Sequence, residues 1–253
     1  MAGCTRPNTT RRCAGLHAFA AVEGWTKDGL WQRVRTARGT LRAKHVVVAT
    51  NGYTSANLSW FRRRLIPVTA FIMATEPIER WVMDDILPRR RMVSDTRKEL
   101  SFYRPSPDGT RILFGGRPNV FGNNERSAAI GLHARMAQVW PQLRNVKLTH
   151  SWLGNVAMTF DRLPHLGQEE GIHYALGCNG NGVALMSWLG HQTAQRILGR
   201  RNRPSAFEDR PFPAAPLLPN NTWLLPLASG GYHLRDFLDR PGAVLAERRS
   251  RGA

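Results

Sequence analysis

Short hydrophobic stretches separated by tight turns begin the chain. Residues 19–49 contain three of them, joined by turns at 27–29 and 37–39. The first two read as strands of a meander. The third ends in the unbroken apolar run 46–48, which is typical of a parallel strand with both faces covered. We therefore expect a β-meander that leads into a central strand of an α/β sheet.

The middle of the chain has the pattern of a smaller antiparallel sheet. Residues 55–64 and 78–87 predict short helices, and the apolar segment between them predicts a strand that is interrupted at Pro67. Three short strands are expected within 92–117, with a turn at 107–109.

Longer elements are predicted after residue 124. A helix is expected over 125–140, with an apolar face formed by Ala129, Leu132, Met136 and Trp140. Strands are expected at 146–159 and 172–177, followed by a helix at 182–198. The prolines after Arg200 predict an extended tail.

A glycine-rich loop joins the last predicted strand to the last predicted helix. Residues 177–183 space their glycines as G-x-x-G-x-G. Such glycines let the backbone approach a flat or anionic ligand, and the first N–H groups of a helix favour negative charge. Glycine-rich turns also begin helices that bind nothing, so the loop alone leaves a purely structural role open.

The charge balance is strongly basic. The chain has 36 Lys and Arg against 18 Asp and Glu, a net charge of +18. Only four residues are lysine, the arginines are dispersed, and no nucleic-acid-binding motif accompanies them, so we expect no specific nucleic-acid partner. The three cysteines and the dispersed histidines predict no disulfide framework and no metal site. We expect no membrane span and a cytoplasmic location.

Four motifs in order carry a family resemblance: VVVATNGYT, LSFYRPSPDGTRILFGGR, SWLGNVAMTFDRLPHLG and YALGCNGNGVALMSWLG. This order resembles the FAD-dependent oxidoreductases of the D-amino-acid-oxidase superfamily, in particular its γ-glutamylputrescine oxidase-like members. The resemblance covers residues 19–239. It implies FAD as cofactor and hydride transfer from a substrate carbon to flavin N5.

The resemblance also implies site residues. Tyr103, Arg104 and Trp152 are candidate substrate contacts, with core packing as the alternative for Trp152, and no catalytic base is implied. Asp161 is expected to hold the loop before Pro164. The implied cofactor-binding residues are Ala49, Thr50, Asn51, Gly52, Gly154, Asp161, Gly177, Asn179, Gly180, Asn181, Gly182 and Val183.

Two departures from the family pattern shape the functional expectation. The first is that the family's N-terminal strand, G-x-G-x-x-G turn and helix have no counterpart in these residues. We therefore expect a fragment, which results first of all from a truncated gene, a misplaced start codon or a frameshift, and otherwise from a partner polypeptide that carries the missing half. The second is Val156, which stands where amino-acid-oxidising relatives carry a carboxylate-binding arginine. An amine substrate is therefore favoured over an amino acid.

The expected fold class is α/β (α+β), an incomplete Rossmann-like FAD-binding domain interleaved with a smaller antiparallel-sheet substrate domain. The predicted parts are 1–62 (partial FAD-binding domain), 63–150 (substrate domain), 151–200 (return to the FAD-binding domain) and 201–253 (proline-rich tail). Two alternatives remain open: a catalytically inactive interaction or regulatory remnant, and a basic nucleic-acid-binding protein.

Overall fold

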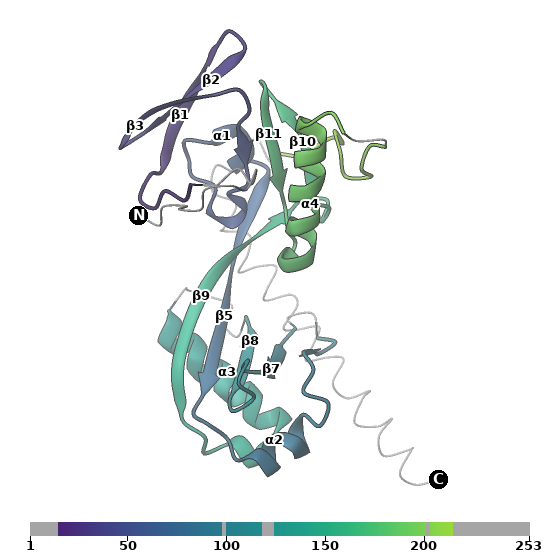
Figure 1. The fold of residues 1–253 in the computed structure, drawn as a ribbon. Coiled ribbons are helices and arrows are strands. Elements are labelled where there is room, and N and C mark those ends of the chain that lie inside the picture. Colours follow the sequence, from purple (N-terminus) through teal and green to yellow (C-terminus); the bar gives the residue numbers. More distant parts are fainter. Residues whose placement is uncertain (1–14, 98–99, 118–123, 201–202, 215–253) are drawn as a thin grey trace, which may run out of the picture.

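Two groups of elements are joined by two long antiparallel strands (Figure 1). The computed structural model describes residues 15–97, 100–117, 124–200 and 203–214. The long strands are β5 (Leu65–Thr75) and β9 (Leu148–Thr159), and they pair along their whole length. The mixed α/β class with antiparallel sheets is confirmed, whereas the domain boundaries stay predictions. Most of the predicted tail lies outside the described residues.

The predicted meander is confirmed. It forms a three-stranded antiparallel sheet of β1 (Val22–Asp28), β2 (Trp31–Thr36) and β3 (Gly39–Ala43). Its turns place Gly29 and Gly39 at positive φ, 63° and 136°, where glycine is least strained.

The predicted central strand is shorter and less covered than expected. β4 (Val47–Val48) pairs in parallel with β11 (Ile172–Leu176), which pairs with β10 (His165–Glu169). Within the described chain, β4 is the edge of this sheet, and 44% of Val47 is exposed while Val48 is buried. The expectation that both faces of 46–48 are covered was therefore wrong for these residues. β10 was not predicted.

The larger sheet has the order β6-β7-β8-β5-β9. β6 (Val93–Ser94), β7 (Phe102–Pro105) and β8 (Ile112–Gly116) confirm the predicted antiparallel segments. The expected interruption at Pro67 was wrong. β8 pairs with β5 only from Phe71 onward, so Pro67 lies where β5 has β9 as its one strand neighbour in the described sheet. Proline is tolerated at such an edge because its missing N–H takes no ladder bond.

Helix α3 (Glu125–Val139) covers one face of this sheet. The side chain of Asn124 caps it by accepting a bond from Ser127 N at 3.2 Å. Leu132 and Met136 are buried as predicted, but Ala128 is buried in place of Ala129. Short segments complete this half: α2 (Arg80–Ile86), as predicted, and the 3-10 turn η2 (Pro141–Leu143).

Helix α4 (Gly182–Ile197) packs on the sheet that contains β10 and β11, with Leu189 against Leu166 and Ala175. The opposite face is covered by an aromatic cluster that includes Phe61 of α1 (Ser59–Arg62). The 3-10 turn η1 (Asn51–Tyr53) follows β4. Among the described residues, no helix has both the length and the apolar character needed to cross a membrane.

Candidate functional site

Asn51 connects the end of β4 to the glycine loop. Its Oδ1 accepts hydrogen bonds from the backbone N–H groups of Gly177 at 3.2 Å and Cys178 at 3.3 Å, and its Nδ2 lies 3.0 Å from Cys178 Sγ. Asn51 has a φ of 45°, a conformation that asparagine tolerates better than most residues. The two loops that the sequence assigned to the cofactor are thus held together by one side chain.

The glycine loop turns sharply between β11 and α4. Gly177 and Gly180 have φ values of 81° and 90°, and Asn179 has 47°. A Cβ on Gly177 would lie 2.4 Å from Thr159 Cγ2, whereas one on Gly180 would meet nothing within 4 Å. Gly177 is therefore required by both packing and backbone conformation, and Gly180 by backbone conformation alone.

The same loop is fixed to the end of β9. Asn179 Oδ1 accepts bonds from the N–H of Thr159 at 3.0 Å and from its hydroxyl at 3.2 Å, and Asn179 N donates to Ala157 O at 3.0 Å. Asn179 Nδ2 donates to Gly177 O at 2.9 Å. These bonds show that the Asn179 side chain shapes the glycine loop and fixes it to β9.

The first turn of α4 has no side-chain cap. Asn181 precedes the helix without a capping hydrogen bond, and no acidic residue occupies the first turn. Val183, the second residue of the helix, is 94% exposed. Uncapped first-turn N–H groups and the helix dipole favour a ligand with negative charge or electron-rich oxygens.

Turn η1 approaches β9 closely. A Cβ on Gly52 would lie 2.4 Å from the carbonyl oxygen of Asn155, so only glycine fits there. The hydroxyl of Tyr53 accepts a bond from Asn155 N at 3.0 Å and lies beside Gly154. Sequence analysis missed Tyr53 and Asn155, because a contact 102 residues apart leaves no local signal.

Asp161 holds the turn before Pro164. Its Oδ1 accepts a bond from Leu163 N at 3.1 Å, and both carboxylate oxygens lie 3.1 Å from His165 Nε2. Burial raises the pKa of Asp161, but the bonds from His165 and Leu163 outweigh it and hold that pKa below its ordinary value. Burial lowers the pKa of His165 more than Asp161 raises it, so the imidazole is neutral and its Nε2–H donates.

Strand β9 presents a row of predicted site residues on one face. Trp152, Gly154 and Val156 alternate along the strand and therefore point the same way. Trp152 pairs with Ile72 of β5, which is opposite Gly115 of β8. Directly opposed residues share a sheet face, so this row lies opposite the α3 side.

The candidate substrate contacts divide between the two faces of the sheet. Arg104 pairs with Leu113 and shares the open face with Trp152. Tyr103 pairs with Phe114 on the α3 side, where its ring stacks at 5.3 Å on Phe114 and lies 4.7 Å from Trp140. Its packing supports a core role, and burial raises its pKa.

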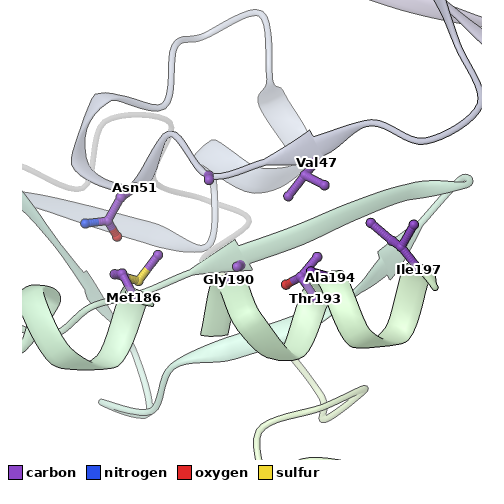
Figure 2. A pocket seen from close by; sticks show the side chains of 9 residues that line it. Val47, Asn51, Met186, Gly190, Thr193, Ala194 and Ile197 are labelled. Carbon is purple, nitrogen blue, oxygen red and sulfur yellow. The ribbon is translucent and has the colours of Figure 1, made fainter. Parts of the chain in front are cut away.

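An apolar cavity of about 340 Å³ lies between β4 and α4 (Figure 2). Asn51 and Ala49 border it at the end of β4, and Val47 lines it beside the open strand edge. The wall from α4 is formed by Met186, Gly190, Thr193, Ala194 and Ile197. The remaining residue of the predicted loop, Thr50, bonds to Thr54 at 2.7 Å and braces η1.

A family comparison agrees with this geometry. The family model described as FAD dependent oxidoreductase matches residues 11–196, which include β4, β9, the glycine loop and nearly all of α4. The chain belongs to this family of FAD-dependent oxidoreductases. FAD is therefore the implied cofactor, and the resemblance seen in the sequence is confirmed.

Individual relatives support the same family assignment. The chain is 34% identical over 186 residues to a probable oxidoreductase OrdL of Haemophilus influenzae, covering 72% of this chain and 42% of that protein. It is 30% identical to a gamma-glutamylputrescine oxidoreductase of Escherichia coli, covering 81% and 49%. The chain thus spans about half the length of these relatives.

Solved structures show the same fold. Glycine oxidase from Geobacillus kaustophilus superposes with a TM-score of 0.60 at 22% identity, covering 80% of this chain and 53% of that chain. L-proline dehydrogenase from P. horikoshii gives 0.58 at 21% identity, covering 73% and 51%.

Proposed function

We propose that this chain forms the flavin-facing and substrate-facing parts of an FAD-dependent oxidoreductase that oxidises an amine. The observation that carries the proposal is Asn51, whose side chain fixes the loop after β4 to the glycine loop ahead of α4. FAD, when bound, supplies the two-electron acceptor that converts the amine carbon to an imine.

The residues present fit a flavin. Gly180 leaves open space beside the loop, and the uncapped start of α4 provides N–H groups for the electron-rich pyrimidine edge. The cofactor-binding role extends to Ala49, Gly52, Gly154, Asn181, Gly182 and Val183, which lie on these same loops and strands. Asp161 acts indirectly, by holding the turn that follows β9.

Arg104 and Trp152 lie on the sheet face opposite α3, and they are the candidates that we favour for substrate contact. They lie on strands separated by two others, roughly 14 Å apart at the usual strand spacing, so one small amine does not contact both. Val156 stands on the same face as Trp152. An apolar side chain there offers nothing to a carboxylate, which favours an amine over an α-amino acid.

We further propose that another parallel strand, from elsewhere in the gene product or from a partner polypeptide, pairs with the open edge of β4. Val47 is 44% exposed there and lines the apolar cavity of about 340 Å³ between β4 and α4, and an open strand edge of this kind is a template for pairing. This addition would also complete the parallel sheet on which the family's dinucleotide lies.

Anaerobic reduction tests the substrate class. The chain is mixed with FAD and then with γ-glutamylputrescine or with glycine, and the visible flavin absorbance is followed. Bleaching by the amine and not by glycine is expected. Bleaching by glycine alone would contradict the amine assignment, and a Val156→Leu control, which keeps the site apolar, should leave the preference unchanged.

A further inference from the structure

A second cavity, of about 410 Å³, lies at the other end of β4 and β11. The Asn51 and Gly177 loops follow the carboxyl ends of these parallel strands, whereas this cavity is bordered by residues at or before their amino ends. It lies between the meander, the β10–β11 turn and the end of α4. Its polar lining includes Lys27, Gln32, Lys44, His45, His173 and Arg196.

The lining of this cavity is positively charged. Lys27 and Lys44 border it, and no acidic residue is among the described residues that line it. The nearby carboxylate of Asp28 is already engaged, at 3.2 Å from Arg33 and 3.4 Å from Arg42. Neither lysine has a carboxylate partner within the described chain, and the Lys44 ammonium lies 5.4 Å from the centroid of the Trp31 ring. Two ammonium groups whose charge is not balanced by a carboxylate match the charge of one phosphate monoester dianion.

Arg196 has a different role. Its guanidinium lies 2.7 Å from Glu208 and 2.9 Å from Asp209, so its charge is balanced by the protein itself. These ion pairs fix the end of α4 that forms one wall of the cavity. The charge left for a ligand therefore comes from the two lysines.

Two buried polar residues in the wall have atoms without partners. Gln32 is 5% exposed and its Oε1 has no hydrogen bond, and His173 is 6% exposed and its Nδ1 has none. Proteins rarely leave such atoms unpaired, and the exceptions often mark a ligand or water site. The turn confines Gln32, because a Cβ on Gly171 would lie 2.8 Å from its Nε2. His45 extends the polar wall, with its ring 5.7 Å from that of His173.

We propose that this cavity binds a small phosphate monoester that also carries hydroxyl groups. The lysines bind the phosphate, and the amide and imidazole provide hydrogen-bonding groups for the hydroxyls. The volume lies within the range of small-molecule sites, about 300–1,000 Å³. The proposal is independent of the proposed oxidoreductase activity, because none of these residues belongs to the flavin-facing loops.

Isothermal titration calorimetry with ribose 5-phosphate, inorganic phosphate and ribose tests the proposal on the whole chain. Ribose 5-phosphate should bind, ribose should not, and inorganic phosphate should bind more weakly if the hydroxyls contribute. Equal binding of inorganic phosphate would overturn the ester assignment. Binding should persist with excess FAD present; its loss would assign the cavity to the cofactor.

Matched variants locate the site. Lys44→Met should weaken ribose 5-phosphate binding on the order of ten-fold, as expected for loss of a charge-assisted contact. Lys147→Met, far along the chain and exposed, should change nothing. His45→Glu provides a second variant at an exposed position, and thermal melting checks that each variant folds. Equal weakening in Lys147→Met, or a site that binds a DNA duplex but not the sugar phosphate, would overturn the proposal.

Discussion

Asn51 Nδ2 lies 3.0 Å from Cys178 Sγ, and Cys178 N donates to Asn51 Oδ1 at 3.3 Å, across 127 residues of sequence. One amide thereby closes a ring between two loops that leave neighbouring parallel strands, β4 and β11. This relationship makes the flavin-facing loops a single unit, so a change in Asn51 should affect both.

Replacing Asn51 with glycine should loosen this unit without straining the backbone, since φ is 45° there. Loss of the side-chain bonds to Gly177 and Cys178 should cost about 1–3 kcal/mol of unfolding free energy. FAD affinity should fall as well. Glu170→Gly, at φ 48° in the exposed β10–β11 turn, is the matched control. Chemical denaturation measures the difference; equal stability of the two variants would argue against the role of Asn51.

Gly177→Ala should be destabilising by about 1–3 kcal/mol, because a side chain at φ 81° is strained and its Cβ meets Thr159 at 2.4 Å. Gly190→Ala is the contrasting change. It lies within α4 with open space around it, and should stabilise by about 0.5–1 kcal/mol. Thermal melting of both variants gives the comparison. A neutral Gly177→Ala would mean that the loop is not fixed by β9.

The stability of the fold should fall on acidification. His165 and His173 both have pKa values lowered chiefly by burial, so the unfolded chain binds more protons than the folded chain near the ordinary histidine pKa. Stability is therefore lost as the pH falls from about 7.5 to about 5.5. The lowered pKa of Asp161 adds a loss in the same direction at more acidic pH.

Urea denaturation at several pH values measures this loss. His165→Gln and His173→Gln should each flatten the pH dependence, whatever their effect on absolute stability. His191→Gln, on the exposed side of α4, should leave it unchanged. If both His165→Gln and His173→Gln keep the wild-type dependence of unfolding free energy on pH, then other groups cause the loss of stability in acid.

The open edge of β4 should promote association of the isolated chain. Val47→Lys places a charge on the exposed edge and should reduce self-association, measured by sedimentation velocity over a range of concentrations. Val22→Lys, at a 37% exposed position on β1, is the control for added charge. A wild-type chain that stays monomeric at every concentration would remove the reason to expect a partner at this edge.

Much of this fold follows from local pattern. The meander, the short helices, α3, α4 and the glycine loop were all predictable, because each has its own periodicity or turn residues. Relationships between residues far apart in the sequence were not predictable. The edge position of 46–48 depends on which strands are present beside it, and Pro67 is tolerated because β8 starts pairing only at Phe71.

The candidate site shows the same limit. The residue types and spacing pointed to Asn51 and to the loop 177–183, but no local signal showed that the asparagine bonds to that loop. Similarly, the sequence placed Tyr103 and Arg104 together, whereas neighbouring strand residues point to opposite faces. Only the pairing with Phe114 and Leu113 shows which one packs under α3.

The most direct test of the account is a titration of FAD with the purified chain, followed by visible absorbance, for wild type and Asn51→Gly. The account predicts a saturable perturbation of the flavin bands with the wild-type chain that is strongly weakened in Asn51→Gly and retained in Glu170→Gly. A folded wild-type chain that leaves the free-flavin spectrum unchanged at every concentration would contradict the claim that these loops bind the flavin.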